Sequence, residues 1–520
     1  MIKSIFRRMK TFPFAPILFG LYPVVALYAN NAGEISVDVL PRPLLVVLIL
    51  ALMLMLLARL ALRGWSRAAL LISLMVLLFS FYGHVYDLKK TVLLPLTAFM
   101  RHRYLFPLFL TLFAIGAFFI LRSHENPRLM PALNLMSVAL LAMPLAQTGV
   151  GAITTSRNQQ QAALAELPVR ALSAPSGQPL PSVYFILLDG YMRSDALQRD
   201  MNYDNSAFVQ RLEELGFYVP SCSRSNYGFT QGTMTTALNM DDLGPLSAEI
   251  EQNDLEMGVY ALIQHSKVRQ QLESLGYTSV AFDSGYEWSR IRDADVYLGL
   301  NRDTFVMQSF NGFEAMLIKS TMLRVYTDAT IRQSQVGLAQ ANSPFNEHIE
   351  LERFLLTRLP DLAADPAPKF VFAHVLIPHW PYIFLPDGSI RNDPDFDQYS
   401  PTEEQLRQGY VDSIAYVSDR IATDVEKILA DSKTPPVIVV FGDHGLAGAN
   451  RLQNFTAIYL PGNSGDLYDT ITPVNFFRVI FNRLFDAGYE LVPDVSYDDI
   501  DPGVKEDIQL VPETAPGCLN

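Results

Sequence analysis

The stretch VIVVFGDHG, residues 437–445, decides how the second half of this chain folds. Its first five residues are apolar without alternation, which is typical of a strand buried on both faces of a sheet. A Gly-Asp-His-Gly run follows directly, so residues that can bind metal come where the strand is expected to end. In open α/β sheets, ligands bind beyond the carboxyl ends of the strands. The stretch therefore predicts an α/β domain with a site at that edge.

Three further apolar runs are similar to this strand, and helical patterns separate them. Strands are expected at Val183–Leu188, Ser279–Phe282, Phe370–Leu376 and Val437–Phe441. The 3.6-residue period of amphipathic helices occurs at Asn205–Leu215, Tyr260–Leu275, Asn346–Leu359 and Thr402–Leu429. Strands that alternate with helices predict a largely parallel central sheet covered by helices.

The first 150 residues have a different character. Five apolar stretches there lack Asp, Glu, Lys and Arg, and each is near the length of a helix that crosses a membrane. They are Pro13–Ala29, Leu44–Ala58, Ala68–Gly83, Tyr104–Leu121 and Leu129–Leu145. We expect an N-terminal transmembrane helical bundle of about five helices. A cleaved signal peptide is the alternative for the first stretch, but four more segments follow it.

Basic residues predict the orientation of this bundle. With the N-terminus inside, the basic residues that face the cytoplasm are Lys3, Arg7, Arg8, Lys10, Arg59, Arg63, Arg67, Arg122 and Arg128. The opposite loops hold Arg42, Lys89, Lys90, Arg101 and Arg103, which run against the trend. Five crossings place everything after residue 150 outside. We therefore expect a multi-pass protein of the bacterial inner (plasma) membrane with a periplasmic domain. The absence of charge inside the stretches favours an anchor over an ion-coupled transporter.

The parts of the chain also differ in charge. Residues 1–150 carry 14 Lys and Arg against 4 Asp and Glu, whereas residues 151–520 carry 26 against 49. An acidic domain repels the phosphates of nucleic acids, so DNA and RNA are not expected partners. The chain has two cysteines, Cys222 and Cys518, which excludes a disulfide scaffold and a cysteine-based zinc cluster. The two could pair with each other in an oxidising compartment.

We expect four parts along the chain. These are a transmembrane anchor at 1–150, a linker at 151–180 with a short helix at Gln159–Leu167, an α/β domain at 181–500 and a C-terminal tail at 501–520. The linker is assigned from its Gln, Ala, Pro and Ser residues, which show little period.

Polar residues lie at the ends of three predicted strands. Asp189 follows the first strand, His374 and His379 lie in and after the third, and Asp443 and His444 follow the fourth. Two carboxylates and an imidazole are the ligands expected for a divalent cation. Singly, an Asp-Gly pair is usually a turn and a lone histidine is usually part of the core. Their conjunction predicts a metal site.

These segments resemble the sulfatase-like branch of the alkaline phosphatase superfamily. The likeness is greatest to its membrane-anchored members of the lipoteichoic acid synthase and phosphoethanolamine transferase type. The segments are LLDGY (187–191), SNYGFT (225–230), LNMDDL (238–243), LGYTSVAFDSGYEW (275–288), KFVFAHVLIPHWPYIFLPDG (369–388), VVFGDHG (439–445) and YLPG…LYDTITPVNFFRVIFN (459–482). The resemblance covers about residues 181–500 and makes this the catalytic domain.

The resemblance implies a role for individual residues. It makes Asp189, Thr230, Asp443 and His444 the ligands of one divalent metal ion, manganese, magnesium or zinc, with Thr230 as the nucleophile. Coordination to a dication lowers the pKa of a hydroxyl, and the ion screens the charge of a phosphate ester. His379 would hydrogen-bond a phosphoryl oxygen or protonate the leaving group. Further phosphate contacts would be Arg224 and Asn226.

The sequence leaves two possible roles open for several of these residues. The nucleophile lies in a segment with other hydroxyls, namely Ser225, Thr233, Thr235 and Thr236. This segment is also typical of a loop that enters a helix with an N-cap near Thr230, which would aim backbone N–H groups at an anion. His374 either contacts substrate or is hydrogen-bonded inside the sheet, and Trp288 either touches a head group or closes a turn. His265 is expected to be structural.

Two departures from the broader family narrow the chemistry. Formylglycine sulfatases need Cys or Ser in a C-x-P-S-R context, and residues 222–225, CSRS, lack the proline and the spacing. Sulfate ester hydrolysis is therefore disfavoured. The segment Leu446–Gln453 after GDHG offers no histidine or acidic residue, which suits a single metal.

The resemblance implies a membrane-anchored, metal-dependent transferase with a phospho-threonyl intermediate. It would move a phospho-alcohol group, of phosphoglycerol or phosphoethanolamine type, from a membrane lipid donor to a cell-envelope glycan or lipid acceptor. Two alternatives remain. One is a phosphodiesterase, phosphomonoester or phosphonate hydrolase of the same fold, and the other is a catalytically silent envelope binding protein.

Overall fold

The structure of the protein, a computed structural model, describes residues 12–32, 35–88, 99–122, 129–164, 169–252, 258–300, 311–333, 345–393, 396, 401–446, 451–462, 465–497 and 518. It divides into two units. The first holds residues 1–155 and 306–347, and the second holds residues 156–305 and 348–520. A segment from the middle of the α/β half of the sequence thus belongs to the N-terminal unit.

The N-terminal unit is built from apolar helices. They are α2 (Ala15–Ala29), α3 (Pro41–Leu62), preceded by η1 (Val37–Val39), α4 (Trp65–Asp87), α5 (His102–Arg122) and α6 (Leu129–Leu164). Four segments are long and apolar enough to cross a membrane, namely Val37–Leu62, Trp65–Asp87, His102–Arg122 and Leu129–Gly149. The fifth apolar helix, α2, has 15 residues. Each predicted stretch therefore lies on one helix, and four of the five reach crossing length.

Some expectations for this unit lie outside the described residues. They concern Lys3, Arg7, Arg8, Lys10, Lys89, Lys90 and Arg128. The short helix expected at Gln159–Leu167 is not separate, because α6 continues through the supposed linker to Leu164, and residues 165–167 lie outside the described part. Polar residues alone do not end a helix, since Gln and Ala are good helix formers.

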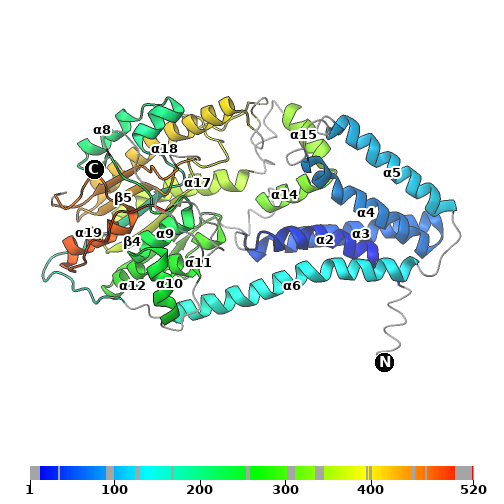
Figure 1. Ribbon diagram of the computed structural model, residues 1–520, viewed down its shortest axis with the longest axis horizontal. Coiled ribbons are helices and arrows are strands. Elements are labelled where there is room, and N and C mark those ends of the chain that lie inside the picture. Colours follow the sequence, from blue (N-terminus) through cyan, green and yellow to red (C-terminus); the bar gives the residue numbers. More distant parts are fainter. Residues whose placement is uncertain are drawn as a thin grey trace. The chain divides into compact units, whose positions relative to one another are not determined.

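Two helices from the middle of the sequence complete the unit. They are α14 (Gly312–Ser320) and α15 (Arg324–Gln333), and α14 packs against α2 and α4 (Figure 1). The start of α14 is fixed by a capping box between Asn311 and Glu314. A Cβ atom at Gly83 of α4 would lie 2.2 Å from the carbonyl oxygen of Lys319, so glycine permits the close approach of the two helices.

The second unit contains a six-stranded sheet within the described residues. Its strands are β1 (Val183–Leu188), β2 (Thr278–Phe282), β3 (Val296–Leu298), β4 (Lys369–Val375), β5 (Val437–Gly442) and β6 (Thr456–Tyr459). Their order is β3-β2-β4-β1-β5-β6, and all neighbours are parallel except β5 and β6. The largely parallel sheet and its four predicted strands are confirmed. Leu188 pairs with both Val375 and Gly442, so β4, β1 and β5 end at the same level.

Helices cover both faces of this sheet (Figure 1). One face carries α9 (Thr230–Asn239), α11 (Val259–Gln264), α12 (Lys267–Ser274) and α19 (Pro473–Phe485), and the other carries α8 (Ser206–Glu214), α17 (Asn346–Arg358) and α18 (Glu403–Asp431). The shorter elements are α7 (Ser194–Ala196), η4 (Leu197–Met201), α10 (Leu243–Gln252), η5 (Glu287–Ser289) and η6 (Pro360–Ala364). Every residue of β1 is buried, because alternate side chains enter the two layers. Phe185, for example, packs into the same core as Met234 of α9 and Phe477 of α19.

Two local features bear on the predictions. The helix expected at Tyr260–Leu275 is broken at His265, because the Ser266 side chain accepts a hydrogen bond from the Arg269 N–H and starts α12. Cys222 and Cys518 form a disulfide with Cα atoms 5.5 Å apart. The two cysteines that the sequence analysis left able to pair are therefore joined.

Candidate active site

The level ends of β4, β1 and β5 bring the predicted polar residues together. Asp189 continues from β1, and its N–H donates to the Val375 carbonyl at 2.9 Å. The next residue, Gly190, has φ +78°, a conformation that glycine adopts without strain, and its N–H donates to Asp443 Oδ1 at 2.8 Å. The turn after β1 is thereby joined to the GDHG turn after β5.

Asp189, Asp443 and His444 form a buried cluster. One ligand atom from each lies within 4.8 Å of the others. Asp189 Oδ1 and Asp443 Oδ2 are buried and have no hydrogen-bond partner among the described residues. His444 Nδ1 donates to the Gly445 carbonyl at 2.7 Å, which leaves the Nε2 lone pair directed at the cluster. Buried carboxylate oxygens without partners are costly, so the donor set fits a divalent cation.

The nearby histidines favour ionised Asp189. Burial raises the pKa of this carboxyl, but the charge of His379 and the hydrogen bond and charge of His374 outweigh burial. The pKa of Asp189 is therefore held well below its ordinary value. An ionised carboxylate is the form that binds a metal.

Thr230 is the first residue of α9 and meets this cluster. Its Oγ1 lies 3.3 Å from His444 Nε2. The N-cap is Phe229, which has an extended backbone and no side-chain cap bond, so the cap expected near Thr230 is one residue earlier. The four competing hydroxyls are buried and bonded to backbone carbonyls, namely Ser225 to Leu452, Thr233 to Tyr227, Thr235 to Val259 and Thr236 to Gly232.

A cavity of about 250 Å³ opens beside Thr230. It is lined by Gly190, Phe229, Thr230, Gln231, His379, Trp380, Tyr382, His444, Gly445, Leu446 and Arg451. The His379 Nδ1–H donates to the Trp380 carbonyl at 2.8 Å, so Nε2 is the nitrogen left for a substrate. Both proposed catalytic side chains, Thr230 and His379, thus face one cavity.

The four predicted substrate contacts lie elsewhere. None of Arg224, Asn226, Trp288 and His374 is among the described residues that line the cavity. Asn226 is fully buried and bonded to Thr472, Val474 and Val495. Trp288 is 3% exposed, and its ring centroid lies 5.3 Å from that of His374. Their role in substrate binding stays a prediction.

His374 lies behind Asp189. It is fully buried in β4, and its Nε2 is 3.2 Å from Asp189 Oδ2. A carboxylate only accepts hydrogen bonds, so this nitrogen carries the hydrogen, and Nδ1 faces Ser289 Oγ at 3.3 Å. The arrangement gives His374 the position of a residue that orients a metal ligand.

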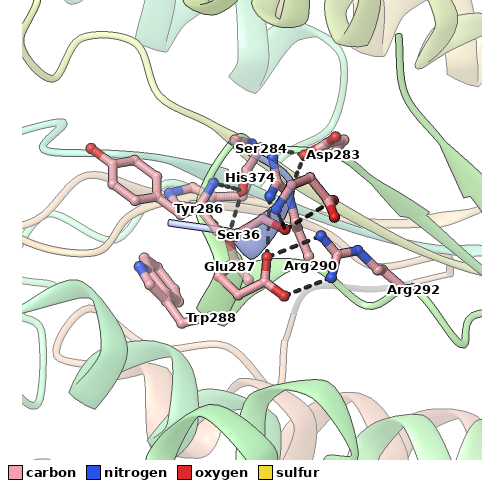
Figure 2. Close-up of polar contacts among 12 residues, drawn as sticks. Ser36, Asp283, Ser284, Tyr286, Glu287, Trp288, Arg290, Arg292 and His374 are labelled. Carbon is pink, nitrogen blue, oxygen red and sulfur yellow. Dashed lines mark hydrogen bonds and ion pairs between the residues drawn. The ribbon is translucent and has the colours of Figure 1, made fainter. Parts of the chain in front are cut away.

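A network of charges supports this histidine. Figure 2 shows His374 beside the turn after β2, where Asp283, Glu287, Arg290 and Arg292 are joined by ion pairs. Arg290 Nε lies 2.7 Å from Asp283 Oδ1, and Glu287 accepts bonds from both Arg290 and Arg292. Asp283 and Arg290 are both buried. Removing one partner of a buried ion pair strongly destabilises a protein, because the other charge is left buried without compensation. These ion pairs join residues on both sides of Ser289, the hydrogen-bond partner of His374 Nδ1.

Residues that the sequence did not single out also surround the site. Gln231, Tyr382 and Arg451 line the cavity, and His348 and Glu352 lie on one face of α17. The pKa of His348 is lowered to about 4 and the pKa of Glu352 is raised to about 8, in both cases chiefly because the side chain is buried. The spacing of four residues on a helix was the one available signal, and it is too common to identify a site.

One family model matches part of the α/β half of the chain. Residues 233–480 match the family model described as Sulfatase, so the predicted sulfatase-like branch of the alkaline phosphatase superfamily, an enzyme class, is confirmed for this domain. Asp443, His444 and His379 lie within the matched residues, whereas Asp189 and Thr230 precede them. No curated protein matches the chain.

Solved structures give a distant likeness. The C-terminal periplasmic domain of EcEptC from Escherichia coli, in complex with Zn, is 13% identical with a TM-score of 0.42 and covers 66% of this chain and 96% of its own. The phosphoethanolamine transferase EptA from Neisseria meningitidis is 11% identical with a TM-score of 0.35, covering 86% and 88%. A phosphonate monoester hydrolase of Agrobacterium radiobacter is 12% identical with a TM-score of 0.36, covering 61% and 80%. These values concern the fold alone and identify no substrate.

Proposed function

Because residues 233–480 match the Sulfatase family model, we propose that this protein is a membrane-anchored phosphotransferase with Thr230 as its nucleophile. It moves a phospho-alcohol group, of phosphoglycerol or phosphoethanolamine type, from a membrane lipid to an envelope glycan or lipid acceptor. One observation carries the proposal. The Thr230 hydroxyl faces the cavity 3.3 Å from His444 Nε2, beside two buried carboxylates with oxygens that lack described partners.

Asp189, Thr230, Asp443 and His444 would hold one divalent ion, manganese, magnesium or zinc. When bound, the ion would lower the pKa of the threonine hydroxyl and screen the negative charge of the phosphate ester. In the described part of the segment 446–453, residues 446 and 451–453, no histidine or carboxylate is available for a second ion.

In the first half-reaction Thr230 forms the covalent bond to the substrate. Its hydroxyl proton passes to solvent, Oγ1 attacks phosphorus, and the bond from phosphorus to the lipid alcohol oxygen breaks. His379 gives its Nε2 proton to the leaving oxygen, and its Nδ1 bond to the Trp380 carbonyl holds the ring in place. The product is a phospho-threonine and a free lipid alcohol.

The second half-reaction reverses these roles. His379, now without its Nε2 proton, takes the proton of the acceptor hydroxyl as this oxygen attacks phosphorus. The bond between phosphorus and Thr230 Oγ1 breaks, and Oγ1 takes a proton back from solvent to restore the hydroxyl. The phospho-alcohol group has then moved to the acceptor, and no proton is gained or lost overall.

Two features support a lipid donor outside the cytoplasm. Four membrane-capable helices would hold the domain at the membrane surface, which raises the local concentration of a lipid substrate. The disulfide between Cys222 and Cys518 suits an oxidising compartment such as the periplasm. We therefore place the α/β domain on the periplasmic side of the bacterial inner membrane.

Hydrolysis is the second candidate function. Trp380 is 38% exposed at the cavity, so water has access to a phospho-threonine there. A silent binding protein is less well supported, because such a protein does not need all four of Asp189, Thr230, Asp443 and His444.

Mass spectrometry of the full-length protein tests the proposal. We expect an adduct on the Thr230 peptide after incubation of the purified, metal-loaded protein with native lipid extract, and its mass identifies the transferred group. Thr230→Ala should lose the adduct and turnover, whereas Thr235→Val, which removes a buried neighbouring hydroxyl, should keep both. Turnover that persists in Thr230→Ala would exclude this nucleophile. Release of the group to water rather than to an acceptor would favour hydrolysis.

A further inference from the structure

One residue gives the cavity a permanent charge. Among the described residues that line it, Arg451 is the sole Arg, Lys, Asp or Glu. The imidazoles of His379 and His444 and the phenol of Tyr382 complete the ionisable groups on this lining. When a divalent ion balances the charges of Asp189 and Asp443, Arg451 leaves the cavity with a positive charge even when both histidines are neutral.

Two anchors hold Arg451 at this position. Its Nε donates to the carbonyl of Gly228, two residues before Thr230. Its own carbonyl accepts the N–H of Gly445, which directly follows His444. The next residue, Leu452, accepts bonds from both the backbone N–H and the hydroxyl of Ser225. The arginine is thus tied to the loop that leads to Thr230 and to the GDHG turn.

Phosphoryl transfer requires positive charge near the reacting phosphate, which this arginine can supply. Negative charge spreads over the non-bridging phosphoryl oxygens in the transition state, and fixed cations near them stabilise that charge. A guanidinium presents donors on several nitrogens in one plane, which suits phosphate oxygens. The ligand set fits a single metal ion. Any second fixed cation near the phosphoryl oxygens would therefore be a side chain of the protein.

We propose that Arg451 binds a non-bridging oxygen of the phosphoryl group that Thr230 accepts. This inference rests on the proposed function and names the cation that complements a one-metal site. Arg451 touches the substrate in this assignment, and its bond to Gly228 keeps the guanidinium beside the nucleophile.

Binding of inorganic phosphate tests the assignment without turnover. The probe is titrated calorimetrically into metal-loaded, full-length protein in detergent, and metal affinity is measured on the same samples. We expect Arg451→Gln to weaken phosphate binding at least about tenfold, as for a lost hydrogen bond to a charged group, with metal affinity within about twofold. Arg451→Lys should be intermediate, because it keeps the charge and loses the planar donors.

The matched control is Arg199→Gln. Arg199 donates to the Gln453 side chain, two residues beyond Arg451, but does not line the cavity. This variant should bind phosphate as the wild type does. Added methylguanidinium should restore phosphate binding to Arg451→Ala and leave Arg199→Ala unchanged.

Three outcomes overturn the assignment. Unchanged phosphate affinity in Arg451→Gln would remove Arg451 from the phosphate site and leave the proposed function standing. A parallel loss of metal and phosphate affinity, without rescue by methylguanidinium, would reduce Arg451 to a support of the Thr230 loop. A metal-loaded wild type that binds no phosphate would contradict both this assignment and the proposed function.

Discussion

His374, one of the predicted substrate contacts, lies behind Asp189 and is not among the described residues that line the cavity. Its hydrogen bond to Asp189 Oδ2 from inside β4 fixes the orientation of the carboxylate that we propose as a metal ligand. We expect His374→Ala to weaken metal binding by about 10- to 100-fold, the usual effect of losing such a partner. Metal titration of the purified variant gives the affinity.

The control for this prediction is His265→Ala. His265 is also largely buried, but it pairs with Asp293 rather than with a metal ligand. His374→Gln should recover part of the affinity, because its amide donates to Asp189. Wild-type affinity in His374→Ala would show that Asp189 needs no such support.

Glu352 links stability to pH. Its Oε1 accepts the Leu376 N–H, its Oε2 has no described partner, and burial above all raises its pKa to about 8 from an ordinary 4.5. Between these two values the folded carboxyl keeps a proton that the unfolded one has lost. The folded state then binds more protons, so the contribution of Glu352 to stability falls as pH rises from about 5 to 8. The loss is on the order of a few kcal/mol at ~1.4 kcal/mol per pKa unit.

Glu352→Gln removes this dependence. Glutamine resembles the protonated carboxyl and still accepts from Leu376. We expect the melting temperature of the variant to equal that of the wild type near pH 5 and to exceed it near pH 8. Glu350→Gln, on the same helix and at the surface beside Arg353, should show no such divergence. Equal melting curves at pH 8 would mean that Glu352 is ionised without cost.

At the scale of elements, Gly442 decides how β5 ends beside the turn after β1. A Cβ atom there would lie 2.1 Å from the backbone oxygen of Tyr191, which cannot move aside as a flexible side chain could. We expect Gly442→Ala to destabilise the α/β domain by about 1–3 kcal/mol or more, the range for overpacking. It should also weaken metal binding, because Asp443 is the next residue.

Thermal unfolding and metal titration check this prediction together. Gly244→Ala in α10 is the control, since nothing lies within 4 Å of a Cβ atom there. That substitution should leave the melting temperature unchanged or raise it, as alanine favours a helix. A Gly442→Ala variant as stable as the wild type would mean that the two turns separate easily.

The strands that the sequence predicts are those with a continuous run of apolar residues. Continuous apolar runs identified four strands because strands buried on both faces need no alternation. Strand β3 has three residues, and β6 is an antiparallel neighbour of β5, so neither produces such a run. The cluster of Asp189, Asp443 and His444 was predictable because its residues follow strands directly. The position of Arg451 was not predictable, since it depends on a hydrogen bond to the Gly228 carbonyl, which is far away in the sequence.

At the scale of the whole molecule, α14 and α15 connect the two halves of the sequence. Arg42 at the start of α3 pairs with Glu314 of α14. At the end of α4, Asp87 Oδ2 lies 2.7 Å from Arg324 Nη1. With 9 and 10 residues, α14 and α15 are too short to cross a membrane. The ends of α3 and α4 that they contact should therefore lie on one side of the membrane, the periplasmic side in the proposed topology.

This topology predicts which positions a membrane-impermeant maleimide reaches in intact spheroplasts. The background is silent, because both native cysteines are in the disulfide. Val37→Cys, before α3, and Phe99→Cys, after α4, replace exposed side chains and should react. Arg63→Cys, at the other end of α3, should react only after the membrane is opened. Labelling of Arg63→Cys in intact spheroplasts, with protection of the other two, would place the α/β domain in the cytoplasm and exclude a periplasmic donor lipid.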